Sequence, residues 1–129
     1  MKKLILIAII AMLPAIGMSQ TGMNWKKFVS GATLAASANY TITTSGVYSS
    51  WSVFFKVGTA TVTTSTVKVQ VSPDGTNWID YSGMPAVTIV SATPIAFEDA
   101  YVSSRWMRFV FTIAAGDIIP VDGWYVFKN

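Results

Sequence analysis

The segment spanning residues 47–57 shows the clearest alternation of apolar and polar side chains. Its odd positions are mostly apolar and its even positions mostly polar, with Phe54 as the exception. Successive side chains of a β-strand point to opposite faces, so this pattern predicts a long strand with one face in a core and the other in water. Residues 66–71 and 105–113 alternate in the same way. The side chains predicted to face the core are Val47, Trp51, Val53, Phe55, Val57, Val67, Val69, Val71, Met107, Phe109, Phe111 and Ile113.

Six shorter segments also favour strands and are separated by residues typical of turns. They span residues 25–29, 40–44, 76–81, 86–90, 95–98 and 123–128. The strongest turn signal is the Ser-Pro-Asp-Gly sequence at 72–75, because proline presets φ, aspartate bonds the backbone and glycine accepts positive φ. Residues 34–38 are expected to form a loop. Nine strands without an intervening helix exclude a parallel α/β sheet. They predict an all-β protein, a single antiparallel β-sandwich of jelly-roll or Greek-key type over residues 20–129.

Residues 1–19 follow a different pattern, in which a basic start precedes an apolar run. Lys2 and Lys3 are followed by the uncharged residues 4–16 and then by small residues. This order is typical of a secretory signal peptide, and it predicts export to the periplasm, cell surface or medium. The alternative is a retained hydrophobic helix, with membrane contact only if residues 4–18 are kept. Such a helix would span roughly 22 Å, against about 30 Å for a bilayer core.

The absence of histidine and cysteine limits the chemistry open to this chain. Without histidine there is no Ser-His-Asp or Cys-His catalysis and no imidazole metal site, and without cysteine there is no disulfide. The neighbouring acids Glu98 and Asp99 are expected on opposite faces of a strand, so they do not form a glycosidase pair together. We therefore predict no catalytic residue, no metal and no cofactor, and a protein that is not an enzyme.

The charge balance gives no indication of nucleic-acid binding. The formal net charge is +3, and two of these charges come from Lys2 and Lys3 in the leader. The other basic residues form no extended tract beyond Lys26 and Lys27, whereas nucleic-acid binding depends on a basic stripe or patch. The expected partners are instead proteins, further copies of the same chain, or a glycan.

Two sequence motifs resemble those of a known group of β-sandwiches. Residues 67–81 read VKVQVSPDGTNWIDY, and this strand, turn and second strand resemble a hairpin of discoidin-like, galactose-binding-like domains. Residues 105–110, RWMRFV, resemble the strand of those domains that carries aromatic residues and arginines. The hairpin also resembles small β-domains of bacteriophage particles. The resemblance implies a β-sandwich, with a ligand bound by loops at one end in the galactose-binding-like case.

Four residues are candidates for binding a ligand or partner, and each also has a purely structural interpretation. They are Trp78, Trp106, Arg108 and Trp124. Five tryptophans and five tyrosines favour stacking against sugars, although aromatic residues also fill sandwich cores. Trp106 and Arg108 are expected on an outer face, where either a loop or another molecule covers the tryptophan. Arg108, together with Arg105, could bind a carboxylate or phosphate, or pair with Glu98 or Asp99.

Asp74 and Asn77 offer oxygen atoms that could contact a calcium ion. A calcium site requires six or more oxygen ligands, usually including several carboxylates. Because the turn at 72–75 favours an aspartate in any case, we interpret Asp74 mainly as a structural turn residue.

Three functions are compatible with these observations. The first is a non-enzymatic exported structural protein, a building block or attachment component of a bacteriophage particle or bacterial surface assembly. Its aromatic strand faces and edges would be buried against partners or copies. The second is a carbohydrate-binding module, which requires aromatic side chains clustered at one loop end or on one sheet face. The third and weakest is a small secreted hydrolase, which requires two carboxylates within about 10 Å in a cleft.

Overall fold

A computed structural model describes residues 24–43, 50–99 and 104–128, so the predicted leader at 1–19 lies outside the described residues. The described ranges contain strands and no helix. The strands are β1 (Lys26–Leu34), β2 (Ala38–Thr43), β3 (Ser50–Val57), β4 (Thr66–Ser72), β5 (Ile79–Asp80), β6 (Val87–Thr88), β7 (Ile95–Asp99), β8 (Trp106–Thr112) and β9 (Ile119–Lys128). Nor do these ranges hold any helix with the length and apolar character needed to cross a membrane.

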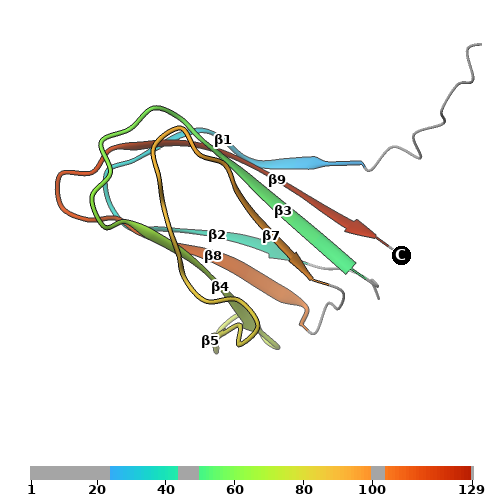
Figure 1. The fold of residues 1–129 in the computed structure, drawn as a ribbon. Helices are drawn as coiled ribbons and strands as arrows, with labels where there is room; N and C mark the ends of the chain where they lie inside the picture. Colours follow the sequence, from blue (N-terminus) through green and yellow to red (C-terminus); the bar gives the residue numbers. More distant parts are fainter. Residues whose placement is uncertain (1–23, 44–49, 100–103, 129) are drawn as a thin grey trace, which may run out of the picture.

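The strands form two antiparallel sheets that face each other as two layers (Figure 1). One sheet has the order β1-β9-β3-β7. The other has the order β2-β8-β4-β5, and β6 pairs with the opposite end of the β4 edge from β5. The prediction of an all-β antiparallel sandwich is confirmed.

The strand pairing is that of a jelly roll, which was one of the two predicted topologies. β1 pairs with β9, β2 with β8 and β3 with β7, while β4 pairs with both β5 and β6. The chain is therefore one long antiparallel hairpin, whose successive strand pairs alternate between the two sheets. Because of this wrapping, β9 lies between β1 and β3, two strands that are far from it in the sequence.

Aromatic side chains from both sheets fill the core. Trp51, Phe55, Phe109 and Phe111 are almost wholly buried, as the alternation predicts. The centroid of the Phe55 ring lies 5.2 Å from the Phe109 centroid and 5.1 Å from the Phe111 centroid, and both contacts are edge-to-face. Such contacts favour aromatic pairs beyond their buried area. The core faces predicted for the described parts of residues 47–57, 66–71 and 105–113 are confirmed, with Ile113 only partly buried.

The predicted boundaries are wrong for the two terminal strands, which are both longer than expected. β1 continues to Leu34 rather than ending at 29, through register shifts around Gly31, which adopts a φ of +58°. β9 begins at Ile119 rather than at 123. The two strands extend each other by pairing. Gly123 of β9 leaves room for a core ring, because a Cβ there would lie 2.8 Å from the Phe55 ring.

Two predicted strands of the second sheet are shorter than expected. The segment predicted at 76–81 is a strand only at Ile79–Asp80, and the one predicted at 86–90 only at Val87–Thr88. The backbone N–H groups of Thr76 and Asn77 bond the Asp74 carboxylate instead of β4, which delays the start of β5.

Asp117 ties together the loops at one end of the sandwich. Its buried carboxylate accepts hydrogen bonds from the backbone N–H of Thr63 at 3.0 Å and from the Ser65 hydroxyl at 2.5 Å. The Ser65 oxygen in turn accepts the N–H of Ala114 at 2.9 Å. These bonds, first that from Ser65, hold the pKa of Asp117 below its ordinary value. Sequence patterns did not predict this structural role for Asp117, whose geometry is that of a loop anchor.

Candidate binding groove

Phe54 and Trp124 form an aromatic pair on the outer face of the β1-β9-β3-β7 sheet. They are directly opposite each other in the pairing of β3 with β9. Their ring centroids are 6.0 Å apart and their planes are inclined by 45°. The flanking Val53 and Phe55 point into the core, so strand alternation places Phe54 outside.

The aromatic pair belongs to a row of side chains that crosses all four strands of this sheet. In register, Lys27 of β1 is opposite Trp124, and Ala96 of β7 is opposite Phe54. The Lys27 ammonium lies 5.1 Å from the Trp124 ring centroid and 2.7 Å from Oδ1 of Asp122. The hydrogen bond from Lys27, followed by that from the Gly31 N–H, lowers the pKa of Asp122. The β1 end of the row is therefore charged and paired, and the β7 end is small and apolar.

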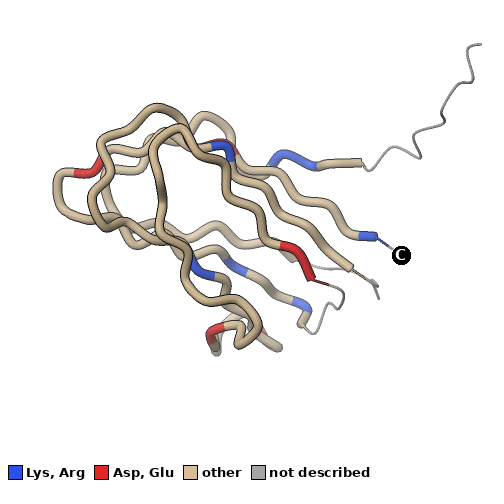
Figure 2. The backbone as a smooth tube through the Cα atoms, viewed as in Figure 1, with Lys and Arg blue, Asp and Glu red and all other residues tan. Residues whose placement is uncertain are grey.

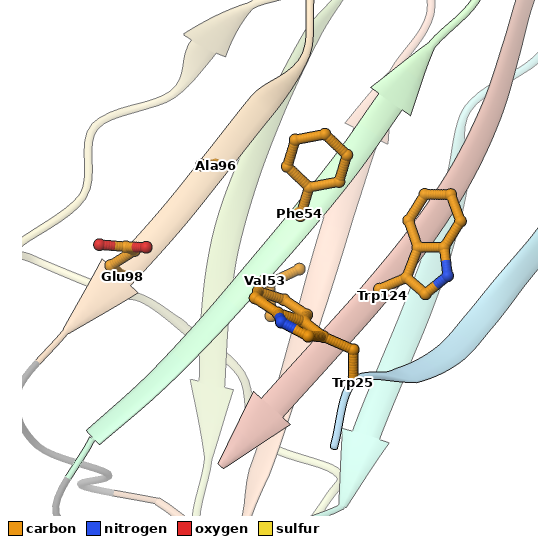
Figure 3. Close-up of a pocket in the computed structure, with 6 residues that line it drawn as sticks. All are labelled: Trp25, Val53, Phe54, Ala96, Glu98 and Trp124. Carbon is orange, nitrogen blue, oxygen red and sulfur yellow. The ribbon is translucent and has the colours of Figure 1, made fainter. Parts of the chain in front are cut away.

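A second row lies alongside the first and is partly covered by Trp25. Val126 of β9, Ser52 of β3 and Glu98 of β7 are opposite one another, on the same face as Phe54. Val126 and Ser52 are each only 4% exposed, although they lie on the outer face. Figure 3 shows Trp25 reaching from the start of β1 across β9 toward β3. Trp25 itself is 40% exposed, so it forms a wall rather than part of a closed core.

The residues around these rows border an open hollow of about 420 Å³, which we call the aromatic groove. Its described lining residues are Trp25, Val53, Phe54, Ala96, Glu98 and Trp124 (Figure 3). Small-molecule sites have volumes of roughly 300–1,000 Å³ and are mostly apolar with a few polar groups. Glu98 is the one charged residue among these six. Its carboxylate makes no hydrogen bond or ion pair with any residue that the structure describes.

The outer face of the opposite sheet carries a chain of polar contacts. The Arg108 guanidinium lies 4.3 Å from the Trp78 ring centroid and donates through Nε to Oε1 of Gln70 at 2.8 Å. Gln70 donates to Asp80 at 2.6 Å, and Lys68 forms an ion pair with Asp80 at 2.9 Å. These bonds, first that from Gln70, lower the pKa of Asp80. The prediction that Arg108 pairs with Glu98 or Asp99 is wrong, because those acids lie on the other sheet.

Trp106 is covered by a loop, which resolves the two alternatives left open for it. It lies beneath the 72–75 turn, where Gly75 has a φ of +77°. A Cβ on Gly75 would lie 3.2 Å from two atoms of the Trp106 indole. The backbone of the turn therefore packs directly on the ring, and Trp106 is only partly exposed.

The Asp74 carboxylate is saturated by its own turn. It accepts the backbone N–H groups of Thr76 and Asn77 at 2.8 Å each, the Asn77 side-chain amide at 2.6 Å and the Ser72 hydroxyl at 2.9 Å. These bonds, beginning with the backbone N–H of Asn77, hold its pKa far below the ordinary range. Asp74 and Asn77 thus satisfy each other. No group of three or more His, Cys, Asp or Glu side chains suited to a metal occurs in the described part of the chain.

The four predicted binding residues are divided between the two sheets. Trp78, Trp106 and Arg108 lie on one outer face, and Trp124 lies on the other, where it joins Phe54 and Trp25. Sequence reasoning did not select Phe54 or Trp25 for binding. The available signal was Phe54 itself, an aromatic residue at a position where alternation requires a polar one.

Charged residues are scattered along the chain. Figure 2 shows Lys and Arg on both layers, with Asp or Glu elsewhere on the same layers and no single face of one sign over the described residues. Opposite charges form ion pairs between Lys27 and Asp122 and between Lys68 and Asp80. This distribution does not provide the basic stripe that nucleic acid requires.

Comparison with known proteins finds that this chain is similar to them in fold. No protein-family model matches the chain, and no curated protein matches it significantly. The crystal structure of PBSX exported protein XepA is similar over 81% of this chain and 36% of its own, with 15% identity and a TM-score of 0.59. This chain thus spans just over a third of that protein. A structure described as "CBM4 structure and function" is similar over 81% of this chain and 70% of its own, with 14% identity and a TM-score of 0.42. The predicted resemblance to β-sandwich domains is confirmed at the level of the fold.

Proposed function

We propose that the protein is a non-enzymatic, exported binding module that holds a carbohydrate in the aromatic groove. The observation that carries this proposal is the meeting of Trp25, Phe54 and Trp124 on one outer sheet face. Aromatic rings stack against the apolar C–H faces of sugars, while the hydroxyl edges of the sugar need polar partners such as Glu98. This arrangement meets the requirement stated above for a carbohydrate-binding module, which is a cluster of aromatic side chains on one sheet face.

Export is supported by the order of residues in the leader, in which Lys2 and Lys3 precede a long apolar run. The similarly folded XepA is itself described as an exported protein. Both observations suit a module that meets glycans outside the cytoplasm, at a cell surface or on a phage particle.

A non-enzymatic role is supported by the placement of the adjacent acids. Glu98 points to the outer face, whereas Asp99 accepts a hydrogen bond from the Tyr81 hydroxyl on the other side of β7. A glycosidase needs two carboxylates that flank one bond. In the aromatic groove, Glu98 is the single acid among the described lining residues.

The proposal is tested by affinity electrophoresis of the purified protein in gels that contain laminarin, barley β-glucan, galactan or xylan. We expect at least one polysaccharide to retard the wild-type protein. Phe54→Ala and Trp124→Ala should each remove most of the retardation. Trp78→Ala is the matched control, because its ring lies on the opposite sheet, and it should migrate as wild type. Equal retardation of all four proteins would place binding elsewhere.

A second candidate function is that of a building block in a bacteriophage particle or bacterial surface assembly. It is favoured by exposed aliphatic side chains, namely Ile79 at 65%, Val90 at 54% and Ile118 at 54%. Ile79 lies on β5, at an edge of its sheet, where strands are open to pairing with another chain. Sedimentation velocity would show concentration-dependent assembly that Ile79→Ser weakens. A monomer at all concentrations would exclude self-assembly.

A further inference from the structure

We infer that the aromatic groove selects uncharged glycans over acidic ones, and that Glu98 is the residue that sets this selectivity. The inference rests on the proposed function and deepens it, because it names the class of ligand. It follows from where Glu98 lies relative to Phe54 and from the charges that surround the groove.

The position of Ala96 leaves one side of the Phe54 ring open. Ala96 is directly opposite Phe54 on β7, and its methyl group is too small to cover a phenyl ring. On the other side, Trp124 packs against Phe54, and the two ring centroids are 6.0 Å apart. A flat ligand can therefore stack against Phe54 only over β7, with Ala96 as its floor.

Glu98 lies beside this stacking position. It follows Ala96 by two residues on the same face of β7, a separation of about 7 Å along an extended strand. A pyranose ring seated over Ala96 would thus present its hydroxyl edge to the Glu98 carboxylate. An ionised carboxylate only accepts hydrogen bonds, so it favours hydroxyl donors and repels a uronate or phosphate group.

Two lysines of this sheet face, Lys27 and Lys56, do not offset this charge within the groove. The Lys27 ammonium is held by Asp122 at 2.7 Å. Lys56 lines a separate hollow together with Asp122, Gly31 and Pro120. The Asp122 charge interacts with both lysines, so it offsets part of the positive charge at that end of the sheet face.

A sugar fits this arrangement better than a cationic ligand does. Quaternary ammonium groups are bound by aromatic rings that surround the cation. Here Phe54 and Trp124 stand side by side as a wall, and the Lys27 ammonium already lies over Trp124. The open side of Phe54 instead offers one flat face with one acceptor at its edge, which matches a neutral pyranose.

The test compares each polysaccharide with its carboxymethylated derivative, using the wild-type protein and two variants that each remove one charge. Laminarin, galactan and barley β-glucan serve as the probes, and affinity is measured by titration of tryptophan fluorescence. We expect wild type to bind the unmodified polymer at least tenfold more tightly, as one charge-assisted bond allows. Glu98→Gln keeps an acceptor oxygen and should reduce this preference to below about threefold. Lys56→Gln, on the same face but outside the groove, should retain the full preference.

The possible failures distinguish the inference from the proposed function. If Phe54→Ala abolishes binding while Glu98→Gln keeps the wild-type preference, the selectivity is not due to Glu98, although the groove still binds glycan. If Glu98 serves only to protect the β7 edge, Glu98→Gln will promote aggregation without changing the preference. If no probe binds, both proposals fail.

Discussion

Phe54 and Trp124 are opposite each other on β3 and β9, seventy positions apart in the sequence, with ring centroids 6.0 Å apart. Both side chains are half-buried and both lie outside the core. Cross-strand aromatic pairs stabilise a sheet by roughly 0.2–1 kcal/mol, which is small beside the burial of a core aromatic side chain. We therefore expect the pair to be only a minor source of stability.

The first prediction concerns the contribution of the Phe54–Trp124 contact to the free energy of unfolding. A double-mutant cycle with Phe54→Leu and Trp124→Leu should give a coupling of about 0.5 kcal/mol in the free energy of unfolding from urea titrations. Each single variant should remain folded, because the core residues on either side are unchanged. A coupling above about 2 kcal/mol would mean that the pair is primarily structural.

The second prediction concerns the contact of Gly75 with Trp106. Gly75→Ala places a side chain at a φ of +77° and 3.2 Å from the indole, whereas Gly116→Ala meets a similar φ of +88° with open space around it. Both variants should lose about 1 kcal/mol from the left-handed backbone, and Gly75→Ala should lose about 1 kcal/mol more from crowding. Thermal unfolding of the two variants checks this. Equal losses would show that the turn does not pack on Trp106.

The third prediction concerns acid stability and Asp117. Its pKa is lowered from 3.8 in the folded protein, so the unfolded chain takes up a proton first as the pH falls. The contribution of its hydrogen bonds is therefore complete above about pH 4 and declines below it, as the pH approaches the folded-state pKa. Asp74, Asp80 and Asp122 shift in the same direction, so the whole protein should lose stability in acid.

The variant that isolates this effect is Asp117→Asn. It should be less stable than wild type at pH 7, and the difference should narrow at pH 3, where the wild-type carboxylate loses its advantage. Urea unfolding at the two pH values gives the comparison. A difference that is the same at both would mean that the Asp117 carboxylate does not contribute through its charge.

The fourth prediction concerns metal at the 72–75 turn. Because the Asp74 carboxylate already accepts hydrogen bonds from Ser72, Thr76 and Asn77, we expect no change in the melting temperature when calcium is added or chelated. A site filled at ten times its dissociation constant would add about 1.4 kcal/mol, which corresponds to several degrees. A rise of that size on addition of calcium, and its absence in Asp74→Ala, would restore the calcium interpretation.

The strand faces of the core were predictable because alternation is a local property. Trp51, Phe55 and Phe109 each lie at a position whose parity in the strand assigns it to the buried side, and the structure buries all three. Strand ends were less predictable. β1 extends past residue 29 because β9 pairs with it across Gly31, and β5 is shortened by hydrogen bonds to Asp74. Those effects depend on partners that a local pattern does not contain.

The sequence by itself determined a histidine-free, cysteine-free chain of alternating strands and therefore an all-β sandwich without the usual catalytic groups. It also determined that Phe54 points away from the core. The tertiary structure decided that Trp124 and Trp25 stand beside it, while Trp78 and Arg108 lie on the other sheet. The physical reason is that side-chain parity fixes the face of each residue, whereas the neighbours on that face depend on strand order. Strand order is set only when the jelly roll closes and places β9 between β1 and β3.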